Sequence, residues 1–530
     1  MVNPKFIGAP PTRQPFEGVL RPSVGRLRTA SRFPTRSARR VRGSGGAARL
    51  GLPLAAAALA IACATGDNVD AGADPRPNIV FLLSDDQSYG TMGHDGEPWM
   101  RTPGMDRLAA EGARFTRAFV TTSLCSPSRA SFLSGRWARN HGVLDNKTEL
   151  PSNLPTFASE LGAAGYDTAY VGKWHMGQQQ EYPGFNFYAS YLGQGRYHDG
   201  VFNLNGVAEK TEGWVDDVAT DYALEFLREK RDAPFLLFVG FKSPHGPHNK
   251  LGPAKRLLGL YEDATLAPPP NVAALPPYPD TRALEKLVAK GVRKRPYGVP
   301  EDWVGLLGKP RKARHPKEGV NWLNPHRRAY HQLIAGVDEN VVRILDLMDE
   351  LGLTENTIVV YASDNGFCNG AHGIWPKRAA YEESIRVPLL VRYPPLIRPG
   401  TSVDRLALNV DLAPTLLELA GVEAPDAMQG RSLVPLLEGR DAEWRTSFVY
   451  EYFYEPPFYT PTLYALRTEA WKLVEYPGYP GWTELFHLAE DPHETANVAG
   501  SEEHAATLAA LRAELAEHER GIGPRPRGFE

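Results

Sequence analysis

Cysteine is scarce in this chain of 530 residues, since only Cys63, Cys125 and Cys368 are present. Three cysteines cannot form the disulfide framework that stabilises small secreted domains. Stability must instead come from a buried apolar core, and a hydrophobic content of 42% is sufficient for a large one. Each cysteine therefore needs its own explanation, and Cys368 is most simply an unpaired thiol in a loop or in the core.

The N-terminal apolar stretch is too short to cross a bilayer. It covers thirteen residues, 50–62, and follows a segment with eleven Lys or Arg side chains and a single acid, Glu17. This pattern is typical of an export signal rather than of a membrane-spanning helix. Small residues precede Cys63 and a polar linker follows it, so we predict an exported protein, periplasmic or anchored to the membrane by a lipid at Cys63. Cleavage nearby with release is the alternative.

Positive charge is sparse outside that N-terminal segment. Without residues 1–62, 48 basic and 61 acidic side chains remain, which changes the net charge from −3 to −13. A net acidic body argues against nucleic acid as a general partner. Any anionic substrate must therefore be bound by a local cluster of cations.

Four continuous apolar runs stop abruptly at polar residues. They are 78–83 before Asp85 and Asp86, 167–171 before Lys173 and His175, 235–241 before His245, and 357–361 before Asp364 and Asn365. Such runs are typical of strands covered on both faces, and helical patterns at 155–164, 214–231 and 329–351 alternate with them. We therefore predict an α/β fold with a large, mostly parallel sheet sandwiched by helices. Ligands bind such sheets at the carboxyl ends of the strands, where these polar residues lie.

The domain organisation follows from shifts in composition. We predict an export signal at 1–62, a linker at 63–75, a catalytic domain at 76–440 and a C-terminal subdomain at 441–530. Residues 251–326 are rich in turn-forming residues, which indicates an insertion at the rim of the site. Short aromatic runs at 448–454, 465–467 and 471–476 and a terminal helix near 502–519 predict an α+β subdomain with a small antiparallel sheet.

Two short runs carry most of the chemical information. Cys125-Ser-Pro-Ser-Arg129 places a thiol near a fixed cation, and Gly172-Lys173-Trp-His175 places a lysine and a histidine at a strand end. Together they resemble the paired signatures of the type I sulfatases of the alkaline-phosphatase-like superfamily. Within that family, the run Gly193-Gln-Gly-Arg-Tyr197 and the block E-Y-F-Y-E-P-P at 451–457 look most like the N-acetylglucosamine-6-sulfatases. The resemblance spans about residues 76–500. It implies that a formylglycine-generating enzyme oxidises Cys125 to formylglycine, whose hydrate is the nucleophile.

Asp85, Asp86, Asp364 and Asn365 form a set of oxygen ligands. Such a set suits a hard divalent cation such as Ca²⁺ far better than zinc. A single acidic pair of this kind is more often a helix cap or a turn, but two pairs at strand ends favour a metal site. The resemblance to the sulfatases implies that the modified residue at position 125 is a further ligand of the metal.

The resemblance also assigns roles to three cations. Arg129 would orient the nucleophile, while Lys173 and Lys377 would bind the sulfate group. Lys377 stands before the run Y-E-E-S-I-R-V-P that the family shares. Without a family match, Lys242 and Arg378 are expected to be solvated surface charges.

Two histidines are the candidates for proton transfer during cleavage, because the ordinary pKa of histidine lies near neutral pH. By resemblance, His245 would contact the sulfate and protonate the departing alcohol. His175 would take a proton from the second hydroxyl of the hydrate, so that sulfate leaves and the aldehyde returns. His248 is a weaker candidate at the rim.

The sequence thus predicts a sulfuric ester hydrolase that acts on a sulfated sugar or glycan. One alternative is a phosphomonoester or phosphonate hydrolase of the same fold, because sulfate and phosphate are nearly isosteric. Another is a non-catalytic lipoprotein that binds sulfated glycans. Parallel kinetics on aryl sulfate and aryl phosphate test the first alternative, and the chemical state of Cys125 tests the second.

Overall fold

The computed structural model describes residues 74–96, 99–278, 323–440, 442–455, 458 and 460–529. The predicted export signal, Cys63 and part of the predicted insertion lie outside the described residues. The predictions made for them, like the predicted domain boundaries, stay predictions. Among the described helices, none has both the length and the hydropathy needed to cross a membrane.

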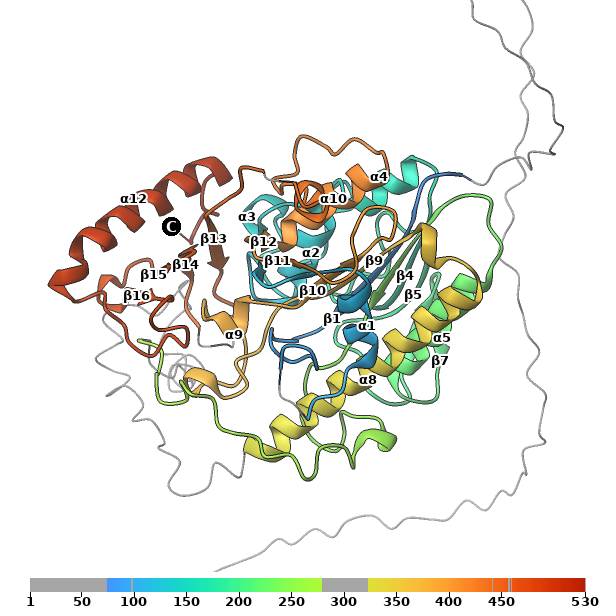
Figure 1. The fold of residues 1–530 in the computed structure, drawn as a ribbon, viewed down its shortest axis with the longest axis horizontal. Coiled ribbons are helices and arrows are strands. Elements are labelled where there is room, and N and C mark those ends of the chain that lie inside the picture. Colours follow the sequence, from blue (N-terminus) through green and yellow to red (C-terminus); the bar gives the residue numbers. More distant parts are fainter. Residues whose placement is uncertain are drawn as a thin grey trace, which may run out of the picture. The chain divides into compact units, whose positions relative to one another are not determined.

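A mixed sheet of ten strands forms the centre of the fold (Figure 1). Its five central strands, β9, β1, β8, β4 and β5, run parallel to one another, and β10 lies antiparallel to β9. This arrangement confirms the predicted α/β fold with a large, mostly parallel sheet. In spatial order the strands are β11 (Thr401–Val403), β2 (Ala113–Phe115), β10 (Leu389–Arg392), β9 (Thr357–Ser363), β1 (Asn78–Ser84), β8 (Phe235–Gly240), β4 (Asp167–Lys173), β5 (Phe187–Tyr191), β6 (Val201–Leu204) and β7 (Val207–Lys210).

Strand β1 shows why the apolar runs are continuous. Ile79 and Phe81 face one apolar core and Val80 faces the other, and all three are completely buried. Burial of one such side chain stabilises the fold by roughly 1.5–3 kcal/mol. A strand between two cores therefore needs apolar residues at every position.

Helices cover both faces of this sheet. The first core contains side chains of α2 (Cys125–Ser134), α4 (Phe157–Ala163), α10 (Leu412–Leu419) and α11 (Val434–Leu437). The second contains side chains of α1 (Pro103–Glu111), α5 (Val215–Arg228) and α8 (Leu323–Glu350), and α5 and α8 lie side by side (Figure 1). Connecting segments hold the short helices α3 (Ala138–His141) and α9 (Glu382–Ile385) and the two-stranded sheet of β3 (Ala118–Phe119) and β12 (Ala407–Leu408).

A second, antiparallel sheet forms the C-terminal subdomain. Its strands are β13 (Ser447–Tyr452), β14 (Leu463–Thr468), β15 (Trp471–Glu475) and β16 (Glu484–His487). Helix α12 (Ala505–Ile522) packs Leu511 and Leu515 on one face of this sheet. On the other face, Phe448 lies 5.0 Å, between ring centroids, from Phe119 of the larger part. This subdomain therefore shares a core with the rest of the fold.

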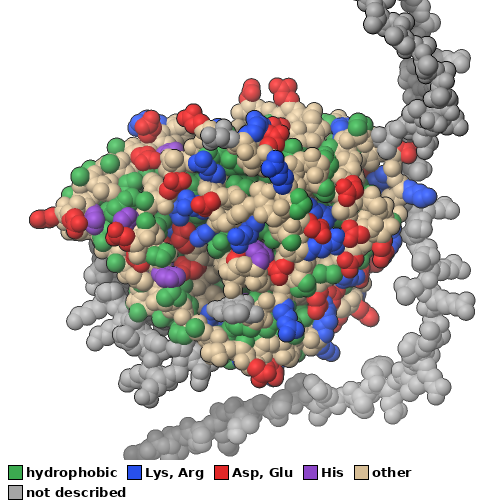
Figure 2. Space-filling model, viewed as in Figure 1, with side chains coloured by type: hydrophobic (Ala, Val, Ile, Leu, Met, Phe, Trp, Pro, Cys, Tyr) green, Lys and Arg blue, Asp and Glu red, His purple; other side chains and the backbone are tan. Residues whose placement is uncertain are grey.

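The strands of the central sheet end in register, and this positions the site. Ser84 of β1 pairs with Ser363 of β9, and Gly240 of β8 pairs with both Leu83 of β1 and Gly172 of β4. The residues that follow these four strands therefore leave the sheet at the same edge. Figure 2 shows that acidic and basic side chains are interspersed over one face of the molecule.

Candidate active site

The four predicted oxygen ligands come together at this edge. Asp85 and Asp86 follow β1, Asp364 and Asn365 follow β9, and all four are buried. Oxygen atoms of Asp85, Asp86 and Asp364 lie within 4.8 Å of one another. The amide of Asn365 donates to Asp86 Oδ1 at 2.6 Å, and the backbone N–H of Asp86 donates to Asp364 Oδ1 at 3.1 Å.

This set fits a hard cation on its chemistry. Asn365 Oδ1 is buried and accepts no hydrogen bond from the described residues. A buried carbonyl without a donor is costly, and three carboxylates converge beside it. Metal coordination would satisfy that oxygen, and an oxygen-only set is the kind that Ca²⁺ prefers.

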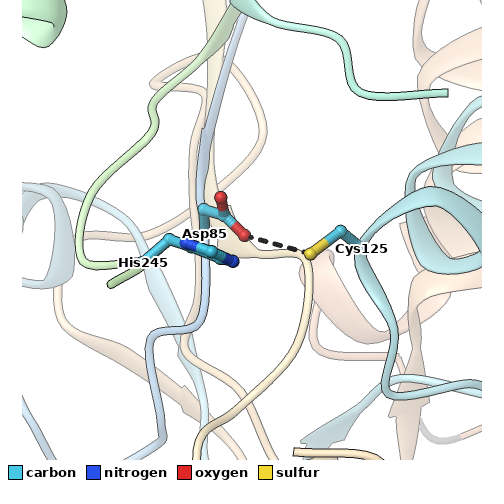
Figure 3. Close-up of side chains that lie close together, drawn as sticks. All are labelled: Asp85, Cys125 and His245. Atoms are coloured by element: carbon cyan, nitrogen blue, oxygen red, sulfur yellow. Dashed lines mark hydrogen bonds between the residues drawn. The ribbon is translucent and has the colours of Figure 1, made fainter. Parts of the chain in front are cut away.

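Cys125 is the first residue of α2 and lies at the same place. Its thiol donates to Asp85 Oδ1 at 3.4 Å and accepts from Lys377 Nζ at 2.9 Å. Figure 3 shows the thiol and the Asp85 carboxylate pointing toward each other, with the His245 ring beside them. Burial, and next the charge of Asp85, raise the pKa of the thiol to about 12. The unmodified side chain is therefore a poor nucleophile at neutral pH.

Arg129 lies one turn farther along α2 and is buried. Its Nε donates to Asp364 Oδ2 at 2.8 Å, and its Nη1 donates to the carbonyl oxygen of Lys173 at 2.6 Å. Its Nη2 has no hydrogen-bond partner among the described residues. The guanidinium is thus held from two sides and keeps one donor group unused.

Two lysines add positive charge around the thiol. Lys173 ends β4, donates to Asp85, and lies 4.0 Å from Cys125 Sγ. Lys377 donates to Asp86, and this pair is buried. Burial alone would raise the pKa of Asp85, but Lys173 and other nearby cations hold it well below its usual value. With Arg129, three fixed cations surround one buried side chain, which makes the site suitable for a tetrahedral anion.

The two predicted histidines lie at this edge as well. His245 follows β8, and one of its ring nitrogens lies within 4.8 Å of Asp85 and Cys125 ligand atoms. His175 follows β4, and its carbonyl accepts the hydroxyl of Ser126. Burial, and next Lys173, lower the pKa of both rings well below the usual value, which favours their neutral forms.

The segment that carries His245 is firmly held. The hydroxyl of Tyr197 donates to the His245 carbonyl, and the Asp85 backbone N–H donates to that of Ser243 at 3.0 Å. His248 bonds the carbonyl of Pro244 through Nε2 at 2.7 Å. His248 thus supports the loop and is buried, rather than lying at the rim.

The expectation of solvated charges at Lys242 and Arg378 was wrong. They are only 3% and 4% exposed. Lys242 Nζ donates to the carbonyl of Gln194 at 2.8 Å, and Arg378 Nη2 donates to Glu455 Oε2 at 3.0 Å. The Arg378 guanidinium also lies 3.4 Å from the centre of the Phe458 ring. These partners are far away in the chain. The one local signal was that Arg378 directly follows Lys377 and that Lys242 lies three residues before His245.

Comparisons with known proteins agree with this geometry. The "Sulfatase" family model matches residues 77–422, and the model "N-sulphoglucosamine sulphohydrolase, C-terminal" matches residues 370–521. An N-acetylglucosamine-6-O-sulfatase of Bacteroides thetaiotaomicron is 33% identical over 86% of this chain and 87% of its own length. The human N-acetylglucosamine-6-sulfatase is 27% identical, with coverage of 80% and 81%.

Solved structures give the same picture. A structure described as bound to its substrate D-glucosamine-2-N,6-O-disulfate is similar with a TM-score of 0.73 and 32% identity, over 84% of this chain and 98% of that one. The phosphonate monoester hydrolase of Agrobacterium radiobacter is similar with a TM-score of 0.68 and 22% identity, over 84% and 96% of the two chains. The second likeness concerns the fold alone.

Proposed function

Because this chain belongs to the sulfatase family and is a sulfatase, we propose that it removes the 6-O-sulfate of a glucosamine-type sugar, with formylglycine at position 125 and one bound Ca²⁺. One observation carries the proposal: Cys125 lies in one buried site with three carboxylates and three cations. The sugar is proposed from the names of the relatives and from the substrate of the similar structure.

The cation would be held by Asp85, Asp86, Asp364 and Asn365, together with an oxygen of the modified residue 125. When bound, a divalent cation withdraws electron density from its oxygen ligands and so makes sulfur easier to attack. Formylglycine in its hydrated form supplies an oxygen nucleophile that a thiol cannot replace.

The remaining steps belong to the side chains around it. Arg129 is fixed by Asp364 and by the Lys173 carbonyl, so its third nitrogen is available to orient residue 125. Lys173 and Lys377 would hold sulfate oxygens. A bound sulfate ester carries negative charge, which would favour the protonated form of His245, and the protonated ring would deliver its proton to the departing sugar oxygen. His175 would take a proton from residue 125.

The test begins with the state of residue 125. The protein is produced together with a formylglycine-generating enzyme, and the peptide containing residue 125 is weighed by mass spectrometry. Sulfate release is then measured with N-acetylglucosamine 6-sulfate. We expect the mass of the aldehyde, sulfate release, and no activity in Cys125→Ala.

Cys368→Ala is the matched control, because Cys368 is also a buried thiol but is not among the groups that converge on the metal and sulfate site. It should keep the activity of the parent protein. An unmodified thiol in active protein, or a Cys125→Ala variant as active as the control, would refute the proposal.

A phosphomonoester or phosphonate hydrolase remains a second candidate, because phosphonate monoester hydrolases share the fold. Paired measurements with 4-nitrophenyl sulfate and 4-nitrophenyl phosphate separate the two. A higher kcat/KM for the phosphate ester would favour the alternative.

We also propose export, with a lipid anchor at Cys63. The support is the N-terminal sequence pattern, and one of the relatives is named an extracellular sulfatase. Incorporation of labelled palmitate that is lost in Cys63→Ala is the expected result. Equal labelling of both proteins would contradict the anchor.

A further inference from the structure

A pocket of about 400 Å³ opens where β5 and β6 meet the loop that follows β5. Its volume lies within the range of roughly 300–1,000 Å³ that is usual for small-molecule sites. Its lining comes from the two strands (Tyr191, Val201 and Asn203), from the loop (Leu192 and Arg196) and from the segment before β5 (Gln180). None of them belongs to the site proposed for sulfate cleavage.

The pocket lies close to that site. Tyr191, the last residue of β5, pairs with Lys173, the last residue of β4. Neighbouring strands lie about 4.8 Å apart, so one wall of the pocket is one strand away from a proposed sulfate ligand.

The loop between Leu192 and Tyr197 connects the two places. Its Gly195 packs directly against the ring of Tyr191, where a side chain would clash. Its last residue, Tyr197, donates a hydrogen bond to the His245 carbonyl, and Lys242 binds the loop at Gln194. The loop that lines the pocket is therefore tied to the segment that carries His245.

The pocket offers an unpaired positive charge. Arg196 is exposed and makes no hydrogen bond or ion pair with any residue that the structure describes. The acid in the lining, Asp199, accepts the backbone N–H of Gly213 at 2.9 Å. The lining thus holds one acid and one base, and the Arg196 guanidinium is the charged group whose donors are left for a ligand; an anion is the ligand that best matches a guanidinium.

The same pocket has an apolar rim. Leu192 and Val201 are 45% and 52% exposed, which is unusual for such residues in this fold. A sugar ring presents an apolar C–H face and a polar edge, so an acidic sugar would match both the rim and the guanidinium.

We propose that this pocket is an accessory subsite for an acidic sugar unit, sulfated or carboxylated, in the same saccharide chain as the unit that loses its sulfate. The proposal rests on the proposed function and extends it from a single sugar to its neighbour. Arg196 would bind the acidic group of this adjacent sugar unit.

The test compares three substrates: N-acetylglucosamine 6-sulfate, the same unit linked to a uronate, and the same unit linked to a neutral hexose. Arg196→Gln should lower kcat/KM for the uronate disaccharide by about five- to thirtyfold, mainly through KM, because one charge-assisted hydrogen bond is lost and solvent weakens it at this exposed residue. For the other two substrates the change should stay below about twofold. Lys210→Gln, an exposed cation on β7 outside the pocket, should change none of the three.

Two results would overturn the subsite. An equal loss on all three substrates would mean that Arg196 only orders the loop that holds His245. No loss on any of them would mean that the pocket does not contact the saccharide.

The subsite can also fail independently of the proposed function. If no sugar loses sulfate, binding of a uronate disaccharide without the 6-sulfate is measured by calorimetry to the parent protein and to Arg196→Gln. Weaker binding to the variant supports the subsite, and equal binding, or no binding to either protein, refutes it.

Discussion

Replacing Arg129 with lysine should reduce catalysis far more than the same change at a comparable arginine elsewhere. Arg129 donates at once to Asp364 and to the Lys173 carbonyl. A lysine ammonium keeps the charge but cannot reach both acceptors in the same geometry. The variant also lacks the third nitrogen, Nη2, that is proposed to orient residue 125. One charge-assisted hydrogen bond to the reacting group contributes roughly 1.5–3 kcal/mol, so its loss corresponds to a decrease of about 10- to 150-fold in kcat/KM.

Arg139 provides the control. It is a buried arginine bonded to Glu451 Oε2 at 2.5 Å and to the Gly523 carbonyl at 2.9 Å, away from residue 125. Arg139→Lys should lower the free energy of unfolding by a similar 1.5–3 kcal/mol and leave kcat/KM unchanged.

The assay is sulfate release per mole of residue 125 in the aldehyde form, combined with urea unfolding of both variants. Counting only aldehyde-containing protein removes any effect of incomplete maturation. If Arg129→Lys keeps kcat/KM within twofold, or if Arg139→Lys loses as much, then Arg129 contributes to folding only.

Three further predictions follow from buried polar groups. Asn365→Ala should raise the calcium concentration needed for half-maximal activity at least tenfold, measured by adding calcium back to chelator-treated enzyme; an unchanged requirement would argue against Asn365 as a ligand. Burial raises the pKa of Glu484 from 4.5 to about 7, so the folded state binds this proton more tightly and stability should fall by about 3 kcal/mol as pH rises from 4.5 to beyond 7. Urea unfolding at pH 5 and 8 should show a smaller difference in Glu484→Gln, and an equal difference would contradict the assignment. Lys242→Met should lower kcat about tenfold with little change in KM and Lys242→Arg should restore part of it; full activity of the methionine variant would show that its bond to Gln194 does not matter for turnover.

The central strands could be predicted because their burial is continuous. The runs 78–83 and 357–361 correspond to β1 and β9, each of which extends up to two residues farther. Strands β6 and β7 gave no such signal, because β7 is exposed at every position and β6 is only partly buried. Strand β16 was also missed, because its four residues are too few to show a period.

The positions of the acidic site residues could also be predicted from the buried strands. Polar residues directly after buried strands had to meet at one edge once the strands lay parallel, which brought Asp85 and Asp364 together. Burial of Lys242 and Arg378 could not be predicted, because it depends on Gln194 and Glu455, which come from other parts of the chain. A cation's surroundings are a property of the tertiary fold rather than of its own sequence neighbourhood.

Complete burial of Cys125 limits when another enzyme could modify this side chain. In the folded chain the side chain has no exposed surface and is enclosed by helix α2, the ends of β1 and β4, and Lys377. No second protein could seat this side chain in its own active site without unfolding the region. If residue 125 is oxidised as proposed, the enzyme that does so would have to act on the nascent or unfolded polypeptide, and molecules that fold first would keep the thiol.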